Sequence, residues 1–105
     1  VGAAVLTDDG RVFAGCNVEN ASYGLSLCAE RVAVFSAIAA GARRLVAAAV
    51  CTPDGGTPCG ACRQVLLEFA DAPEAFAVWV ISPDRVIARY TLAELIPHGF
   101  RLNAK

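Results

Sequence analysis

The sequence predicts a single domain, residues 1–105, with a layered α/β fold around a mixed sheet. The expected order of elements is strand, strand, helix, strand, helix, strand, strand, helix. Helices between successive strands imply crossover connections and therefore a parallel part of the sheet, whereas an opening hairpin adds an antiparallel part. At 105 residues, with no linker long enough to divide it, the chain can form one core without disulfides.

The first two strands lie within residues 1–18 and are joined by a turn at Asp8-Asp9-Gly10. Asp-Gly between apolar segments is a strong hairpin signal because glycine adopts the positive φ angle of a tight turn. The small and polar residues 20–26 then predict a loop.

A first helix is expected over residues 27–40, where alanine is abundant. Ser26 is available as its N-cap, and Gly41 stands where a glycine commonly ends a helix. The continuous apolar run at 44–52 predicts a strand buried on both faces. The same reasoning predicts a helix at 59–69, strands at 76–82 and 85–90, and a short helix at 92–96 that Thr91 caps.

Composition and charge argue against several classes of protein. The net charge of −1 and the pI of about 5.7 provide no basic field for a nucleic-acid polymer. No apolar run approaches the roughly 20 residues that span a bilayer, and no secretory leader is visible, so no membrane partner is expected. The 56% hydrophobic fraction exceeds the usual share and suggests apolar surface for a partner subunit.

The cysteines are better suited to metal binding than to disulfides. Their number, five, is odd, which fits poorly with a closed disulfide framework and favours a reducing cytoplasm. Cys16 and Cys51 lie in predicted strands, and we expect both to be inert, buried thiols. The single histidine, His98, is expected in a loop and not as a ligand.

Cys59 and Cys62 form a Cys-x-x-Cys pair at the start of a predicted helix. Such a pair occurs in redox dithiols, in structural zinc sites with four ligands, and in catalytic zinc sites with three ligands and an open position. Cys28 lies at the start of the other central helix and can supply a third ligand. Because helix N-termini favour thiolates and three ligands leave tetrahedral zinc one vacant position, we expect a catalytic zinc site.

Glu30 strengthens this interpretation. It follows Cys28 by two positions, a spacing that places it near the metal without requiring it to be a ligand. A carboxylate beside a metal-activated water can act as general acid and base. The alternative is an ordinary glutamate that interacts with the helix dipole.

These motifs resemble those of a known family. "CAER" and "PCGACRQ" together resemble the zinc-dependent cytidine deaminases, whose signature is His or Cys, any residue, Glu, and downstream Pro-Cys-x-x-Cys. Residues 1–41 look like the small, homotetrameric, three-cysteine form, and the similarity continues through "PCGACRQVLLEF" to "LAELIPHGF". The resemblance implies a three-layer fold with a mixed five-stranded sheet flanked by helices. It also implies hydrolytic deamination of cytidine or deoxycytidine in pyrimidine salvage, with ammonia released.

The resemblance implies a role for each residue of the metal site. Cys28, Cys59 and Cys62 would bind Zn²⁺. Glu30 would take a proton from the attacking water, protonate ring N3, and then carry a proton to the departing amino group. Arg31 would donate to thiolate sulfur and offset the net charge of −1 that three thiolates give a Zn²⁺ site. The alternative for Arg31 is a surface helix arginine.

The remaining roles concern the nucleoside. Asn17 and Glu19 would hydrogen-bond a ribose hydroxyl, which fits a site that rejects ligands lacking that group. Ala21 and Tyr23 would reach toward a neighbouring subunit's nucleoside, and Phe100 would stack in a neighbour's pocket. The alternatives are a loop turn for the asparagine and a C-terminal core anchor for the phenylalanine.

Two further expectations follow from the family. Its members have an N-terminal helix and an aromatic-containing segment before the stretch that matches "VGAA", so the chain is expected to be N-terminally incomplete. The rival functions are a blasticidin-type nucleoside deaminase, a polynucleotide editor, a non-catalytic zinc-stabilised interaction module and a thioredoxin-like redox protein. The stretch "NVENASY" and Phe100 argue against the first, and Cys28 with Glu30 argues against the last.

Overall fold

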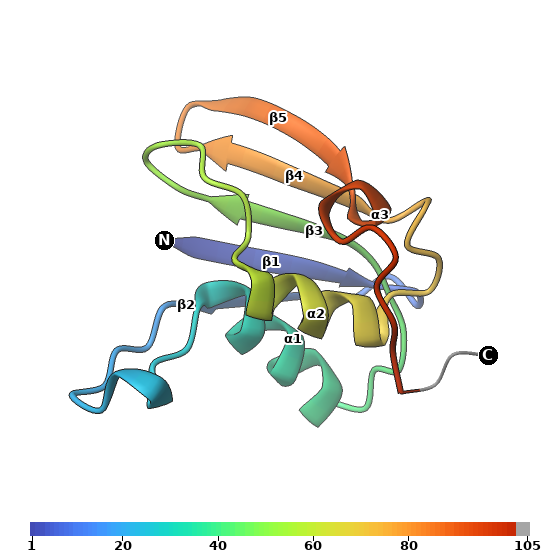
Figure 1. Ribbon diagram of the computed structural model, residues 1–105, viewed down its shortest axis with the longest axis horizontal. Coiled ribbons are helices and arrows are strands. Elements are labelled where there is room, and N and C mark those ends of the chain that lie inside the picture. The colour runs from blue at the N-terminus through green and yellow to red at the C-terminus, as the bar shows by residue number, and fades with distance from the viewer. Residues whose placement is uncertain (103–105) are drawn as a thin grey trace.

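The computed structural model describes residues 1–102, and the elements in that part of the chain follow the expected order (Figure 1). They are β1 (Gly2–Thr7), β2 (Val12–Cys16), the 3₁₀ helix η1 (Tyr23–Leu25), α1 (Ala29–Ala39), β3 (Leu45–Cys51), α2 (Gly60–Phe69), β4 (Ala77–Ser82), β5 (Arg85–Thr91) and α3 (Leu92–Leu95). Only η1 is an addition to the predicted elements, inside the expected loop 20–26.

The five strands form one mixed sheet in the order β2-β1-β3-β4-β5. β1 runs antiparallel to both β2 and β3, β3 runs parallel to β4, and β5 runs antiparallel to β4. The turn between β1 and β2 has Gly10 at φ 88° and is closed by a 2.8 Å hydrogen bond from the Thr7 N–H to the Arg11 carbonyl. The predicted hairpin and the predicted parallel part of the sheet are both confirmed.

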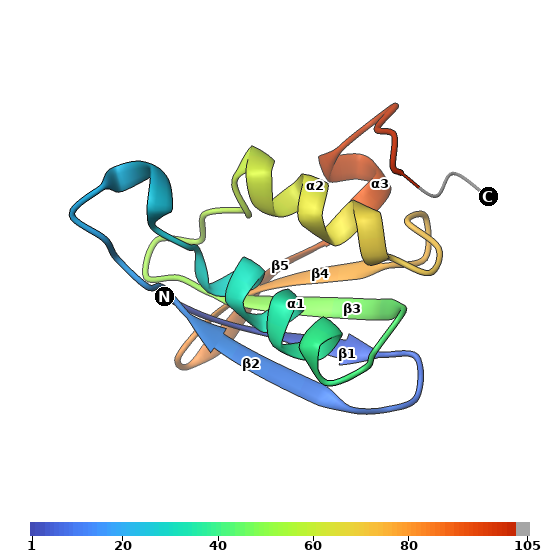
Figure 2. The ribbon, with the colours of Figure 1, turned by 90° about the horizontal axis from the view of Figure 1, so that it is seen from below.

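The α-helices α1, α2 and α3 of the described chain cover the same face of the sheet (Figure 2). α1 connects β2 to β3 and α2 connects β3 to β4, and both connections step in the same direction across the sheet. Right-handed crossovers that step in the same direction place their helices on one face. The third layer that the resemblance implies depends on an N-terminal helix, which the described residues 1–102 do not test, and it stays a prediction.

The core fills the space between this face and the helices. Its largest fully buried side chains include Phe76, Leu45, Leu66 and Leu92, and each contributes roughly 1.5–3 kcal/mol through burial. At Gly15 of β2 the helix α1 comes unusually close, because a Cβ there would stand 2.5 Å from the Ala29 carbonyl oxygen. A glycine at this position therefore sets how closely the beginning of α1 can approach the sheet.

The helix ends test the predicted caps. Thr91 caps α3 in a capping box with Glu94, and Gly41 follows α1 at φ 97°, so both predictions are confirmed. Ser26 as the N-cap of α1 is wrong, because the helix begins at Ala29 and Cys28 is its N-cap residue. The Ser26 hydroxyl instead accepts a 3.0 Å hydrogen bond from the Asn20 N–H and closes the preceding loop.

The expected burial of Cys16 is also wrong. Cys16 ends the edge strand β2, where alternation turns its side chain away from α1, and it is exposed. Cys51, in the central strand β3, is partly buried. None of the helices within residues 1–102 has the length and apolar character needed to cross a membrane.

Candidate metal centre and active site

A short backbone bridge brings the loop after β2 to the start of α1. Val18 and Leu27 exchange hydrogen bonds, with the N–H of each donating to the carbonyl of the other at 2.9 and 2.8 Å. The residues between them project from the body of the molecule as the segment that contains η1 (Figures 1 and 2). The bridge therefore sets Asn17 opposite Cys28 and Ala29.

The N-terminus of α1 is capped from this loop and not by its own N-cap residue. Cys28 has extended backbone angles and makes no side-chain capping bond. Asn17 instead accepts a 2.8 Å hydrogen bond at Oδ1 from the Ala29 N–H. The thiol of Cys28 is thus left free for other bonds while the helix end is satisfied.

The thiols of Cys28, Cys59 and Cys62 converge where α1 and α2 begin. Cys59 is the N-cap residue of α2, and Cys62 is the third residue inside that helix. The Cys28 and Cys59 sulfurs stand 3.9 Å apart, the Cys59 and Cys62 sulfurs stand 3.4 Å apart, and all three lie within 4.8 Å of one another. The three residues that the sequence singled out are therefore brought together.

The environment acts differently on the two thiols of α2. Burial opposes ionisation of Cys59, but hydrogen bonds from the Cys62 backbone and from the neighbouring thiols outweigh it and lower the Cys59 pKa. The pKa of Cys62 is raised, first by burial, then by its hydrogen bond with Cys59 and by the charge of Glu30. Ionisation of Cys62 beside Cys59 and Glu30 is therefore unfavourable unless a positive charge lies among these groups.

Glu30 and Arg31 flank the thiols from the first turn of α1. Glu30 is buried, with only 6% of the residue exposed, and its charge contributes to the raised pKa of Cys62. Nη2 of Arg31 donates to the Cys28 sulfur at 3.5 Å, and this bond is the main reason why the Arg31 pKa is raised. Nε of Arg31 is buried without a hydrogen-bond partner in the described chain. A carboxylate and a guanidinium therefore share the site with the thiols.

Comparison with known proteins decides the family. Residues 1–78 match the family described as the cytidine and deoxycytidylate deaminase zinc-binding region. The chain belongs to the cytidine and deoxycytidylate deaminase family. A cytidine deaminase from Mycobacterium tuberculosis H37Rv is 47% identical over 105 residues, which cover 98% of this chain and 74% of that protein. One from Halalkalibacterium halodurans is 47% identical over 102 residues, covering 95% and 76%.

A solved structure supports the same assignment. The crystal structure of cytidine deaminase from Burkholderia pseudomallei superposes with a TM-score of 0.84 at 48% identity, over 94% of this chain and 80% of that chain. The match covers the mixed five-stranded sheet and its helices, so the predicted α/β fold with this sheet and the predicted resemblance are both confirmed.

The thiol cluster of this deaminase suits the zinc that its family binds. Zinc–sulfur bonds of about 2.3 Å at tetrahedral angles set two sulfurs about 3.8 Å apart. The observed separations of 3.4 and 3.9 Å bracket that value. Within residues 1–102 no fourth histidine, cysteine or carboxylate joins the three thiols, so a tetrahedral ion that they held would keep one position open. Glu30 lies in the first turn of α1, directly after the N-cap residue Cys28 and Ala29. Zinc is therefore the cofactor that these residues fit.

The deaminase chain does not bring all the predicted substrate residues together. Glu19 and Ala21 are exposed in the loop after β2, and Tyr23 in η1 is 89% exposed. Phe100, near the C-terminus, is 82% exposed, so its alternative as a core anchor is wrong. Within one chain these four side chains stand outside the thiol cluster.

Sequence reasoning missed one contributor to the site, the capping role of Asn17. The available signal was the N-cap position itself. A cysteine that ligates a metal cannot also cap its helix, so another polar side chain has to accept from the first N–H groups.

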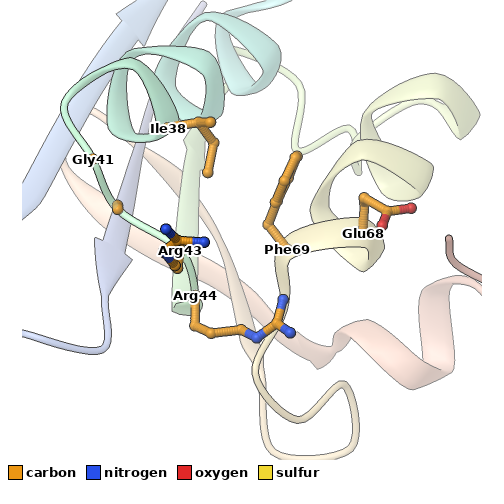
Figure 3. Close-up of a pocket in the computed structure, with 7 residues that line it drawn as sticks. Ile38, Gly41, Arg43, Arg44, Glu68 and Phe69 are labelled. Carbon is orange, nitrogen blue, oxygen red and sulfur yellow. The ribbon is translucent and has the colours of Figure 1, made fainter. Parts of the chain in front are cut away.

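A separate pocket of about 480 Å³ lies at the opposite ends of α1 and α2 (Figure 3). Its lining residues are Ile38, Gly41, Ala42, Arg43, Arg44, Glu68 and Phe69. Helix C-termini carry partial negative charge, which arginines in this position compensate. The pocket contains no thiol and lies a helix length from the metal centre, so we assign the chemistry to the thiol cluster.

Proposed function

We propose that this chain catalyses the hydrolytic deamination of cytidine and deoxycytidine, giving uridine or deoxyuridine and ammonia in pyrimidine salvage. The observation that carries the proposal is the buried carboxylate of Glu30 beside three converging thiols. The 47% identity to proteins named cytidine deaminases supports the choice of substrate.

The chemistry needs a nucleophile and a proton carrier. When bound, zinc supplies the Lewis acidity that makes water a nucleophile near neutral pH. Glu30 accepts one proton from the attacking water and delivers it to ring N3, while the water oxygen bonds to C4. Glu30 then moves the second proton to the exocyclic nitrogen, the C4–N bond breaks, and ammonia leaves. Arg31 stays paired with the Cys28 sulfur and offsets the negative charge of the thiolates.

Asn17 and Glu19 are proposed to bind the sugar. Oδ1 of Asn17 is already occupied by the Ala29 N–H, so the amide Nδ2 is the group left to donate to a hydroxyl. The exposed Glu19 carboxylate can accept from the same hydroxyl. A hydroxyl that both accepts and donates satisfies the two side chains together, and an analogue without it would leave them unpaired.

The proposal includes a homotetramer in the cytoplasm, built from single-domain chains that share active sites. It is supported by large apolar side chains left exposed at the two segments concerned, Tyr23 and Leu25 in η1 and Phe100 near the C-terminus. Ala21, Tyr23 and Phe100 would complete a neighbour's nucleoside pocket. A stable monomer with full activity in analytical ultracentrifugation would contradict this part.

The function is tested by ammonia release from cytidine, with Glu30→Gln as the matched variant and zinc content measured in both proteins. The parent is expected to release ammonia, and the variant is expected to lose about 10²–10⁴-fold in rate while it retains one zinc per chain. Zinc retention without activity in the parent would refute the proposal in favour of a structural zinc module. Oxidative cycling of Cys59 and Cys62 without bound zinc would favour a redox protein.

A further inference from the structure

Arg63 lies directly after Cys62 in α2 and makes three hydrogen bonds through its guanidinium. Nε donates to the Pro58 carbonyl at 2.7 Å, Nη1 donates to the Leu95 carbonyl at 2.7 Å, and Nη2 donates to the Thr57 hydroxyl at 2.8 Å. These contacts join three separate parts of the chain. A half-buried arginine with three short bonds is thus held in one geometry.

All three acceptors of Arg63 are uncharged. Within residues 1–102 its guanidinium forms no ion pair with a carboxylate. Its charge therefore does not balance an acidic side chain. These contacts depend instead on the planar guanidinium, whose N–H donors point in fixed directions.

Two of the bonds act on the segment that carries a thiol of the metal centre. Pro58, which is fully buried, and Thr57 immediately precede Cys59. The Arg63 backbone N–H also donates to the Cys59 carbonyl at 2.9 Å. Arg63 thus holds the chain on both sides of Cys59. Its side chain bonds the two residues before Cys59, and its backbone N–H bonds the carbonyl of Cys59 itself.

Cys59 needs such support because its own side chain cannot provide it. As the N-cap residue it has extended backbone angles and makes no capping bond of its own. Its sulfur must stand within bonding reach of the same ion as Cys28, which lies 31 positions earlier on another helix. A rotation of the Thr57–Pro58 peptide would move that sulfur away from the other two.

The third bond connects this segment to α3. Leu95 is the last residue of α3, where carbonyl groups lack helical partners, and the helix lies beside α2 in both views (Figures 1 and 2). The next residue of α2, Gln64, donates to the Phe100 carbonyl at 3.0 Å. The Nη1–Leu95 bond connects the guanidinium of Arg63 to the end of α3, and the Gln64 bond attaches the segment that follows α3 to α2.

We propose that Arg63 is a positioning residue of the metal centre, which keeps the Cys59 sulfur in place for zinc by bonding Thr57 and Pro58 to the end of α3. The inference rests on the proposed function only in taking Cys59 as a zinc ligand. It does not depend on which nucleoside the site accepts.

The test measures zinc release to a colorimetric chelator in excess, without nucleoside, for the parent, Arg63→Gln, Arg63→Lys and the control Arg43→Gln. Arg43 is an exposed arginine away from the thiols. Partners that orient metal ligands typically change metal affinity 10–100-fold, so Arg63→Gln is expected to release zinc about 10–100-fold faster. Arg63→Lys should fall between it and the parent, because one ammonium cannot reproduce the planar fork. Arg43→Gln should match the parent.

Circular dichroism at the assay temperature establishes that each variant is folded. A folded Arg63→Gln protein with the parent's release rate would overturn the proposal, even if its melting temperature were lower. Should Arg63→Gln not fold, Arg63→Lys decides in the same way. Because the readout is zinc release, a chain that fails to deaminate cytidine still tests the role of Arg63.

Discussion

The side-chain oxygen of Asn17 lies 2.8 Å from the backbone nitrogen of Ala29, so a loop residue caps the helix that carries Glu30. The same amide is proposed to donate to the sugar. One side chain thus connects substrate binding to the helix end that presents Cys28. The bond also fixes the amide orientation, since only oxygen can accept from an N–H group.

Substitutions of Asn17 separate these two functions. Asn17→Ala removes the cap and is expected to lower the free energy of unfolding by about 1 kcal/mol. Asn17→Asp is expected to stay near the parent's stability, because a carboxylate still accepts from the helix N-terminus and interacts well with its dipole. Both variants lose the amide donor and should show a higher KM for cytidine. Urea unfolding of the zinc-loaded proteins and steady-state kinetics check this, and equal loss of stability in both variants would contradict the capping role.

Gly15 is predicted to tolerate no side chain. A Cβ at this position would stand 2.5 Å from the Ala29 carbonyl oxygen and 2.5 Å from the Ala33 nitrogen, both of them backbone atoms of α1. Gly15→Ala should therefore push α1 from β2 and cost about 1–3 kcal/mol of stability, with weaker zinc retention as a consequence. The control is Gly24→Ala, where a Cβ meets nothing within 4 Å. Thermal unfolding of both proteins tests the prediction, and equal melting temperatures would show that α1 can move freely.

Much of this architecture could be predicted from local sequence. The turn at Gly10, the strand β3 and the cap of α3 at Thr91 depend on residues close in the chain, where turn and capping preferences act directly. The expected burial of β3 on both faces is wrong, because Leu45, Ala48 and Val50 are buried while the other residues of the strand are only partly buried. The thiol cluster could be predicted because Cys28 and Cys59 are N-cap residues, Cys62 lies in the first turn after Cys59, and both helices lie on the same face of the sheet.

The features that sequence could not supply depend on distant contacts. The preference of Ser26 for an N-cap position was overridden by the Val18–Leu27 bridge, which starts the helix two residues later than that preference implies. The exposure of Cys16 follows from the position of β2 at the sheet edge, which only the strand order reveals. The contacts of Arg63 require α3 to pack beside α2, and no local pattern encodes that arrangement.

Glu94 makes the stability of the α3 cap depend on pH. Its Oε1 accepts from the Thr91 N–H at 2.7 Å and from the Thr91 hydroxyl at 3.1 Å, and these bonds lower the Glu94 pKa below its ordinary value of 4.5. A pKa lowered by folding means that the carboxylate stabilises the fold fully above the ordinary value. This contribution is lost as the pH falls through the lowered pKa.

The difference in unfolding midpoint between the parent and Glu94→Ala is therefore expected to be constant near neutral pH and to shrink on acidification below about pH 4.5. Urea unfolding at a series of pH values measures it. Because both proteins lose zinc in acid alike, only the difference between them is informative. A difference that grew on acidification would have the wrong sign for a carboxylate that accepts these bonds.

Arg31 is predicted to set the acidity that the metal centre confers on water. Its Nη2 donates to the Cys28 sulfur at 3.5 Å, and three thiolates leave a Zn²⁺ site with a net charge of −1 that the guanidinium offsets. Arg31→Gln removes the positive charge but keeps a donor of similar shape. Without that charge the thiolates donate more electron density to the ion, which then acidifies water less.

Two measurements follow for Arg31→Gln. The value of kcat is expected to fall on the order of 10–100-fold with zinc still bound. Weaker acidification means that the reactive form of water appears only at higher pH. The acid limb of the plot of kcat against pH should therefore shift to higher pH. Arg31→Lys retains the positive charge and should shift the acid limb less, although lysine lacks the planar guanidinium and its several N–H donors. A profile for Arg31→Gln that is lowered at every pH but unshifted would mean that Arg31 orients Cys28 sterically, with no influence on the electrostatics of the site.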